Sequence, residues 1–320
     1  MPDNPSTTSF SLNDRAEAIL RRLTTDSQRL RIEVTEADRC RVIDFGVKVL
    51  GGLNAGLQLA EVCMGGLGTI TLGAKSALID LPEVFVQTDH PISACLLSQY
   101  AGWKIATSDF FAMGSGPIRA AVNKEDLFAE LNYSEATTHG VGVLETSSYP
   151  TESALHAILS SLPDNVAASI CVAKTSSQAG NLQVVARSVE TAIHKLHELH
   201  FPIETIVSAC GSAPLPPVAR NDLQGIGRTN DSILYGGVVH LWTNCSDDEI
   251  HAFGPQTPSD SSPSFGSLFI DLFQEAGHDF YALDKALFSP AVVVFHSLKS
   301  GKMYTFGTTR PDLLQKSFGS

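Results

Sequence analysis

Arg187 and Glu190 are two residues whose types and spacing allow acid–base chemistry. They lie three positions apart within the segment 174–201, KTSSQAGNLQVVARSVETAIHKLHELHF. Side chains three apart on a helix can meet. The carboxylate would then accept a proton, and the guanidinium would orient it and keep it ionised. The alternative is a solvated ion pair on a helix surface, worth roughly 0.2–0.5 kcal/mol, and the residues alone leave both open.

The hydrophobic pattern predicts the helix that positions this pair. Small and polar residues between 175 and 180 suit a helix entry. Val185, Val189 and Ile193 then recur four apart, which predicts one amphipathic helix with an apolar stripe. At 100° per residue the pair falls on the opposite, polar side.

The histidines and cysteines predict no metal site. His194, His197 and His200 are spaced by three, but each step drifts by about 60° around the helix. Three such ligands on one rigid helix converge poorly on a tetrahedral ion. The six cysteines are scattered and form no C-x-x-C pair, so we expect reduced residues, several of them in the core.

Composition bounds the class of protein. The chain has 320 residues, of which 43% are hydrophobic and 18% charged, and its formal net charge is −12. These values are typical of a globular protein, and the acidic balance argues against a nucleic-acid partner. No signal peptide is recognised, and no apolar run reaches the roughly 18–20 residues of a membrane span. We therefore expect a soluble, cytoplasmic protein.

Strand and helix patterns interleave along the chain. This alternation predicts an α/β (mixed α+β) fold with mixed sheets. We expect a disordered N-terminal tail at 1–12, a first α/β part at 13–150 and a second at 151–320, with a soft boundary and parts that can intertwine. Val141–Thr146 is one expected strand, and Ala94–Tyr100 is an expected helix.

Three polar stretches are hard to assign to core packing. Gln87–Pro91 crowds polar groups before the helix at 94–100. Gly114–Pro117 could expose backbone N–H groups to an anion, or form a tight connection with no ligand. Gly227–Gly237, GRTNDSILYGG, is expected to be a glycine-bracketed polar loop.

Known catalytic motifs are missing. No G-x-x-x-x-G-K-[ST] phosphate loop, H-E-x-x-H or G-x-S-x-G motif occurs. The stretch from Gly114 begins like a dinucleotide fingerprint, but Arg119 replaces the third glycine. A redox enzyme with a nucleotide cofactor is therefore disfavoured.

Several long stretches carry a family likeness. They are TDHPISACLLSQYAGW, FFAMGSGPIRA, SQAGNLQVVARSVETAIHKLHEL, GSAPLPPV and GRTNDSILYGG, with EVCMGGLGT, FYALDKALFSPA and the C-terminal SFG. In this order, and over nearly the whole chain after the first dozen residues, the sequence resembles methenyltetrahydromethanopterin cyclohydrolase. One departure is Lys174, where members of the family have proline before the threonine of that loop.

The resemblance implies a function and a site. It implies a cytoplasmic homotrimeric enzyme that interconverts methenyl- and formyl-tetrahydromethanopterin, with a pocket between two α/β parts. No metal or redox cofactor is implied, because the pterin carrier is the substrate. Arg187 and Glu190 match the family's catalytic pair. The expected substrate-binding residues are Thr88, Asp89, His90, Tyr100, Gly114, Ser115, Gly116, Pro117, Ser176, Ser177, Arg228, Thr229, Asn230 and Asp231.

A non-catalytic alternative stays open at this point. A pterin-binding or carrier subunit of a one-carbon complex would keep the pocket but would not need an ionised Glu190 beside Arg187. The absorbance of the methenyl compound, with and without the protein, separates the two.

Activity should survive exhaustive chelation. Neither the scattered cysteines nor the histidine row offers a converging set of metal ligands. We therefore expect methenyl hydrolysis to run at an unchanged rate after dialysis against EDTA, followed as decay of methenyl absorbance. A loss of activity that zinc restores would contradict this.

Overall fold

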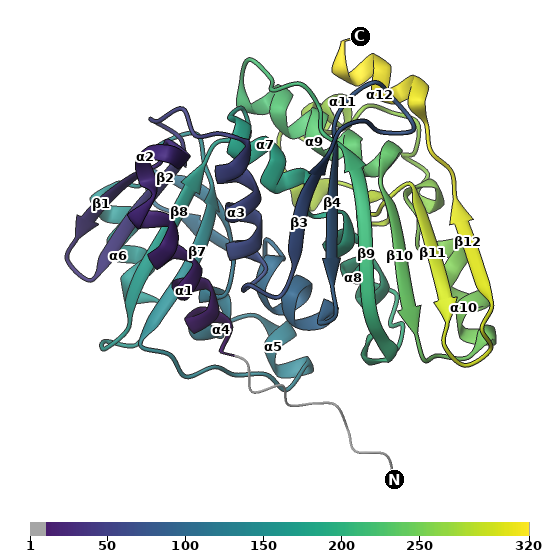
Figure 1. The fold of residues 1–320 in the computed structure, drawn as a ribbon, viewed down its shortest axis with the longest axis horizontal. Helices are drawn as coiled ribbons and strands as arrows, with labels where there is room; N and C mark the ends of the chain where they lie inside the picture. Colours follow the sequence, from purple (N-terminus) through teal and green to yellow (C-terminus); the bar gives the residue numbers. More distant parts are fainter. Residues whose placement is uncertain (1–10, 320) are drawn as a thin grey trace.

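Two six-stranded mixed sheets lie side by side in the computed structural model, which describes residues 11–319. Figure 1 shows the first sheet on the left and the second on the right, with α3 and α7 between them. The mixed α/β, two-part architecture expected from the sequence is confirmed.

The first sheet, sheet A, has a parallel centre and antiparallel edges. Strands β2, β8 and β7 run parallel, and β1, β6 and β5 complete the sheet by antiparallel pairing. In spatial order the strands are β1 (Glu33–Ala37), β2 (Cys40–Gly46), β8 (Ala167–Ala173), β7 (His139–Glu145), β6 (Phe111–Ser115) and β5 (Trp103–Ala106).

The second sheet, sheet B, is antiparallel except for one pair. Only β10 and β11 pair in parallel. The spatial order is β12 (Met303–Gly307), β11 (Val292–Ser297), β10 (Val238–Thr243), β9 (Ile206–Pro214), β4 (Glu83–Thr88) and β3 (Thr69–Gly73). Each sheet thus contains strands from both sides of residue 150, and a division into domains at that residue stays a prediction.

Helices fill the space between the sheets and cover their outer sides. The α-helices are α1 (Leu12–Thr25), α2 (Ser27–Leu30), α3 (Leu53–Cys63), α4 (Ile118–Val122), α5 (Asp126–Glu130), α6 (Glu152–Ser160), α7 (Gln178–Val185), α8 (Ser188–Glu198), α9 (Asp222–Gly236), α10 (Asp247–Phe253), α11 (Phe269–Glu275) and α12 (Pro311–Phe318). A π-helix, η1, spans Ile92–Gln99. Short 3₁₀ turns are η2 (Ile203–Thr205), η3 (Gly254–Gln256), η4 (Ser259–Ser261), η5 (Phe280–Ala282) and η6 (Lys285–Leu287).

The start of α1 falls within the tail that we expected at 1–12. Residues 1–10 lie outside the described residues. Ser11 instead caps α1 by accepting a hydrogen bond from the amide of Asp14, and Leu12 is fully buried. Glu135 accepts hydrogen bonds from the hydroxyl of Ser11 and from the backbone of the first turn, so α1 is anchored to a distant loop.

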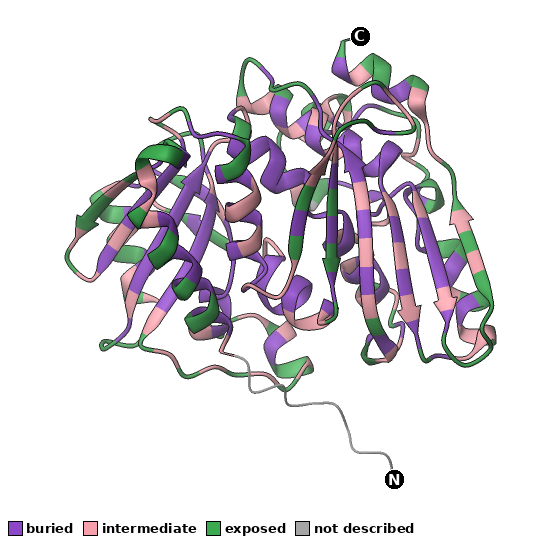
Figure 2. Cartoon of the chain, in the orientation of Figure 1, coloured by how far each residue is buried: buried purple, intermediate pink, exposed green. Residues whose placement is uncertain are grey.

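Separate apolar clusters pack on either side of the central helices. Val185, Val189 and Ile193 pack into a large apolar cluster against the inner face of sheet B. A second cluster joins α1 and α3 to sheet A. Figure 2 shows that α7, β7 and β8 are buried along nearly their whole length. The centre of the molecule is therefore dry, and a polar group placed there needs a partner.

We expected Gly227–Gly237 to be a loop. In the structure residues 227–236 belong to α9, and Gly237 caps its C-terminal end. The glycines of α9 are sites of close packing rather than of turning. A Cβ added at Gly225 would lie 3.1 Å from the backbone of Thr175, and one at Gly227 would lie 3.0 Å from Ile270. Glycine was taken as a loop signal, but here it lets other segments approach the helix.

The polar residues of α9 have buried partners. Thr229 and Asp231 are fully buried. The hydroxyl of Thr229 donates to the carbonyl of Gly225. The carboxylate of Asp231 accepts from the amide of Phe269 at 2.8 Å and from the hydroxyl of Ser317 at 2.6 Å. Asp231 therefore joins α9 to the start of α11 and to α12.

Replacing Asp231 by asparagine should make stability less dependent on pH. Burial raises the pKa of Asp231 to about 7, above its unfolded value of about 4. Its contribution to stability is therefore fully present below about pH 4 and is lost as the pH rises through 7. In Asp231→Asn the amide oxygen can still accept from the amide of Phe269, and the amide nitrogen can donate to the hydroxyl of Ser317, which then acts as the acceptor. Because the asparagine does not titrate, the stability of the variant relative to wild type should rise across this window by an amount on the order of 3 kcal/mol.

Melting temperatures between pH 5 and 8 test this expectation. Asp312→Asn is the matched control, because Asp312 is an exposed carboxylate whose pKa is lowered by its hydrogen bond with Arg310. The control should differ from wild type by a constant offset. A constant offset for Asp231→Asn as well would show that its carboxyl does not titrate in this window.

Candidate active site

The helix expected over 174–201 is interrupted at the residue that carries the guanidinium. Helix α7 ends at Val185 and α8 begins at Ser188, with Ala186 and Arg187 in conformations near ψ 0°. The interruption leaves the carbonyl of Ala186 outside the regular helical bonding, and the side-chain amide of Gln99 donates to it at 3.1 Å. The expectation of one continuous helix was wrong, because the apolar spacing continues in phase across the break.

The guanidinium of Arg187 is buried and held from three sides. Arg187 is only 6% exposed. It donates to the carbonyl of Gln99 at 2.7 Å and to the hydroxyl of Ser115 at 3.0 Å. Its ion pair, at 2.8 Å, is with Glu145 at the end of β7. Within residues 11–319 no ion pair joins Arg187 to Glu190, so the direct pairing that we expected is corrected.

Glu190 occupies the first turn of α8 and is 5% exposed. The solvated surface pair is therefore excluded. Burial raises the pKa of Glu190 to about 7. The charges of Arg187 and Arg119 act in the opposite direction, and Glu145 adds to the rise. We expected Arg187 to keep Glu190 ionised, but burial outweighs it, and the carboxyl is balanced between its two forms near neutral pH.

Two polar atoms at the break between α7 and α8 have no protein partner among the described residues. They are Oε1 of Gln99 and Nε of Arg187, and both are buried. The hydroxyl of Ser188 is also unpartnered, but it lies against β9, because a Cβ added at Gly211 would be 3.0 Å from it. Buried polar atoms are nearly always hydrogen-bonded, so each unpaired one needs an explanation. The acceptor of Gln99 and the donor of Arg187 are what a small polar ligand would satisfy.

A π-helix delivers Gln99 and Tyr100 to the site. The expected helix at 94–100 is η1, and π-helical turns are rare and often functional. The ring of Tyr100 stacks on the imidazole of His194 with centroids 4.4 Å apart. His194 lies one turn after Glu190, and burial lowers its pKa to about 4, so the imidazole is neutral at pH 7.

The histidine row has separate neighbours. His194 lies 3.9 Å from Glu198, and His197 lies 3.2 Å from Glu130. His200 is exposed beyond the end of α8. No group of three His, Cys, Asp or Glu residues suited to a metal ion is found in the described part of the chain.

The glycine-rich stretch 114–117 meets the site through Ser115. Gly114 and Ser115 end β6, and Pro117 caps α4. Gly116 has φ +91°, and its amide donates to the carbonyl of Ser98. That amide is therefore occupied, and the hydroxyl of Ser115 reaches Arg187 instead.

The loop 174–177 supports the entry to α7. The hydroxyl of Ser177 accepts from the amide of Gly180 and donates to the carbonyl of Lys174. The amide of Ser176 donates to the carboxylate of Asp222 at the start of α9. The recorded contacts of both serines are those of a helix cap and a connection between helices.

The remaining expected residues have partners elsewhere. Thr88 donates to the carbonyl of Leu67 and accepts from the amide of His90, and Asp89 accepts from the hydroxyl of Ser208. Arg228 donates to the carbonyl of Pro217 and Asn230 to the carbonyl of Ile226. These contacts, and those of Thr229 and Asp231 described above, do not bring the residues to Arg187. A role in substrate binding stays a prediction for them.

Sequence analysis missed Glu145, Gln99 and Arg119. Glu145 follows five buried residues of β7, and a charged residue that closes an apolar strand was the available signal. Gln99 ends an apolar run, ISACLLSQ. Arg119 was noticed only as the residue that breaks a dinucleotide fingerprint.

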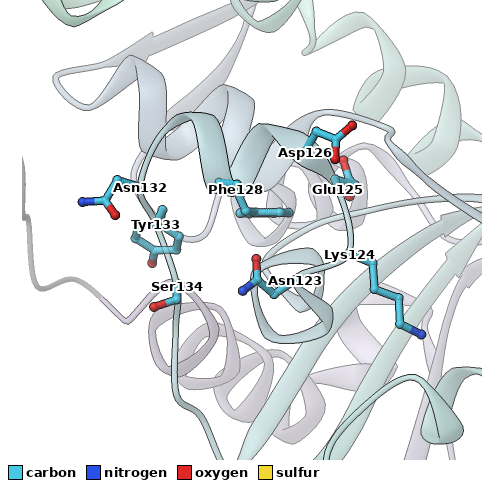
Figure 3. A pocket seen from close by; sticks show the side chains of 9 residues that line it. Asn123, Lys124, Glu125, Asp126, Phe128, Asn132, Tyr133 and Ser134 are labelled. Atoms are coloured by element: carbon cyan, nitrogen blue, oxygen red, sulfur yellow. The ribbon is translucent and has the colours of Figure 1, made fainter.

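Two cavities lie away from the pair. One, of about 340 Å³, is lined by residues 123–134 beside α5 (Figure 3). The other, of about 510 Å³, lies between the loop 78–81 and α12. Neither Arg187 nor Glu190 lines either of them, so the pocket expected between the two parts stays a prediction. None of the helices within residues 11–319 has the length and apolar character needed to cross a membrane.

Comparison with known proteins identifies one family. The profile of the family described as Cyclohydrolase (MCH) matches residues 11–318. A methenyltetrahydromethanopterin cyclohydrolase of Rhodopirellula baltica is 45% identical over 287 residues, covering 87% of this chain and 86% of that protein. Proteins of the same name from Methylobacillus flagellatus and Methylobacterium nodulans are 38% and 40% identical, covering 97% and 96% of this chain and 95% and 97% of their own length.

Glu190→Gln should stabilise the protein progressively as the pH rises. The pKa of Glu190 in the folded chain, about 7, lies above its unfolded value of about 4.3. The stability that the protonated carboxyl contributes is present below about pH 4 and is lost as the pH rises through 7. Relative to wild type, the variant should gain on the order of 2–4 kcal/mol across that window.

Melting temperature as a function of pH is the measurement. Glu198→Gln is the control, because Glu198 lies on the same helix but its side chain is 40% exposed. The control should show an offset that does not vary over this range. If Glu190→Gln behaves in the same way, the carboxyl is not held near neutrality by burial.

Proposed function

The chain belongs to the Cyclohydrolase (MCH) family, and we propose that it interconverts methenyl-tetrahydromethanopterin and formyl-tetrahydromethanopterin by adding and removing water. The observation that carries the mechanism is the buried carboxyl of Glu190, with a pKa of about 7, three residues after a guanidinium whose Nε–H has no protein partner among the described residues. A general base is most effective when its pKa lies near the working pH.

The main requirement of the reaction is a general base, because the substrate carbon is electrophilic without further activation. The methenyl carbon bridges two nitrogens as an amidinium cation and is already electrophilic. A water molecule adds to this carbon and gives up one proton, which leaves a neutral carbinol intermediate. One carbon–nitrogen bond then breaks as the departing nitrogen is protonated, and the carbinol hydroxyl loses its proton as the formyl C=O forms, so one proton in all is released. In the proposed mechanism Glu190 takes the first proton from the water and returns it to the nitrogen, and the second proton leaves to solvent. Such general acid–base assistance typically contributes ~10²–10⁴ in rate.

Arg187 positions the water. Two of its nitrogens are committed, one to the carbonyl of Gln99 and one to Glu145 and the hydroxyl of Ser115. Its Nε–H has no protein partner among the described residues. A guanidinium fixed by two nitrogens presents the third in a defined direction. In the proposed mechanism Nε–H donates to the oxygen of the attacking water or of the formyl product.

Glu145 contributes charge rather than proton transfer. Its side chain is 25% exposed and is paired with Arg187. Together with the ionised form of Glu190 it makes the site negative enough to attract a cationic substrate.

The remaining features of the proposal follow the family. The enzyme works in the cytoplasm as a homotrimer, needs no metal or redox cofactor, and binds the pterin in a pocket between its two parts. A carrier without activity would bind the same compound, but it would gain nothing from a base poised near neutral pH. The assay of methenyl absorbance separates the two functions.

Glu190→Gln should lower turnover by two to four orders of magnitude. The amide keeps the shape of the side chain but cannot accept the proton, so the usual range of general-base loss applies, ~10²–10⁴. Turnover is followed as decay of methenyl absorbance. Wild-type kcat/KM should rise with pH through about 7, because only ionised Glu190 is active and its pKa lies there.

Glu145→Gln is the matched control. It removes the negative charge that raises the pKa of Glu190, so the acid limb of its pH profile should shift to lower pH while turnover above the limb is largely kept. Near-wild-type turnover in Glu190→Gln, or a larger loss in Glu145→Gln, would overturn the assignment of the base.

A further inference from the structure

Arg119 is the largest fully buried side chain among the described residues, at 1% exposure. Its guanidinium forms a two-point ion pair with Glu125, whose side chain is 22% exposed. It also donates to the carbonyls of Leu96 at 2.9 Å and Ser98 at 3.3 Å. A buried arginine is costly unless each of its donors is used, so this position is specified by more than one interaction.

The two carbonyls belong to the last turn of the π-helix η1. The final carbonyls of any helix lack partners within the helix. In η1 Arg119 donates to Leu96 and Ser98, and Arg187 donates to Gln99. The carbonyl of Ser98 also accepts from the amide of Gly116 at 2.8 Å. The rare helical geometry that delivers Gln99 to the site therefore depends on both arginines.

Arg119 also supports the aromatic wall beside Glu190. Its guanidinium carbon lies 5.0 Å from the centre of the Tyr100 ring and 5.4 Å from that of Phe128. The ring of Tyr100 also stacks on the imidazole of His194, with centroids 4.4 Å apart. This stack connects α4, the end of η1 and the second turn of α8, and it lies next to the turn that carries Glu190.

The charge of Arg119 acts on the same carboxyl. Arg187 and Arg119 both lower the pKa of Glu190, against burial and against Glu145. The other titratable groups facing Glu190 are Cys95 on η1 and His194 on its own helix, and both are held neutral at pH 7 because burial shifts their pKa values.

We propose that Arg119 is a second positioning residue for the reaction, which holds Gln99 and Tyr100 against α8 and supplies a positive charge that favours the ionised form of Glu190. The kinetic part of this inference rests on the proposed function. Arg119 does not touch substrate, because it is enclosed by η1, Phe128 and Glu125. It acts through the geometry of Gln99 and Tyr100 and through its field.

Three variants test the inference through the pH at which the acid limb of kcat/KM lies: Arg119→Gln, Arg119→Lys and Glu125→Gln. Loss of the charge in Arg119→Gln should shift the acid limb of kcat/KM to higher pH by about one unit. Arg119→Lys should restore the position of the limb and retain a loss in kcat, because an ammonium group cannot span both carbonyls and Glu125. Glu125→Gln leaves the guanidinium uncompensated and should shift the limb to lower pH.

Arg41→Gln is the matched control for a lost buried arginine. Arg41 is also largely buried, and it pairs with Glu17 on α1 and donates to the hydroxyl of Ser169 on β8. The Arg41→Gln variant should have a lower melting temperature, but the acid limb of its kcat/KM profile should lie at the same pH as in wild type. If Arg119→Gln does the same and Glu125→Gln moves nothing, Arg119 is a structural residue and the inference fails.

A readout without substrate separates this failure from failure of the proposed function. The stability of Glu190→Gln relative to its parent, followed against pH, reports the ionisation of Glu190 in the folded chain. In the Arg119→Gln background the window of change should move to higher pH, and in the Glu125→Gln background to lower pH. These shifts are expected whether or not the wild-type protein hydrolyses the methenyl compound, and an unmoved window in both backgrounds overturns the proposal. Should Arg119→Gln not fold, Arg119→Lys and Glu125→Gln still decide it.

Discussion

The burial of one carboxyl group, that of Glu190, determines the electrostatics at the centre of this molecule. A carboxylate with 5% exposure loses most of its hydration, and that loss raises its pKa to about 7. The surroundings do not cancel this effect, because the nearest guanidinium is shared with a second carboxylate, Glu145. The result is neither a fixed charge nor a neutral acid. Near neutral pH it is a group that changes form at little cost in free energy, as proton transfer requires.

Two irregular helices make that burial possible. The break between α7 and α8 turns Arg187 toward the ends of β6 and β7, where Ser115 and Glu145 receive it. The π-helix η1 covers the polar side of α8 and supplies Gln99, whose amide satisfies the carbonyl freed by the break. Each irregularity thus supplies the hydrogen-bond partner that the other lacks. A regular helix at either place would leave a buried carbonyl unpaired.

The sequence indicated that Arg187 and Glu190 lie close together near one helix, but it misjudged their environment. Helical spacing is local, so the apolar stripe of Val185, Val189 and Ile193 was enough to place Arg187 and Glu190 near one helix. Burial depends on what covers the helix, and η1 and the end of β7 come from residues 40 or more positions away in the chain. The same limit explains α9. Polar residues and glycines that look like a loop in isolation become a helix because Phe269, Ser317 and the backbone of Thr175 pack against them.

The charge of the substrate supports the proposal that Glu190 is the base. Methenyl-tetrahydromethanopterin is cationic at the reacting carbon, and a positive charge over a carboxyl favours its ionised form. The base is therefore most available when the substrate to be hydrolysed is bound. Addition of water removes that positive charge, and the formyl compound is neutral at the same position. Burial and Glu145 then again favour the protonated form. In the proposed mechanism the proton taken from water therefore stays on Glu190 until the nitrogen or the solvent accepts it. A carboxylate with an ordinary pKa would stay ionised throughout and would gain nothing from this change in charge.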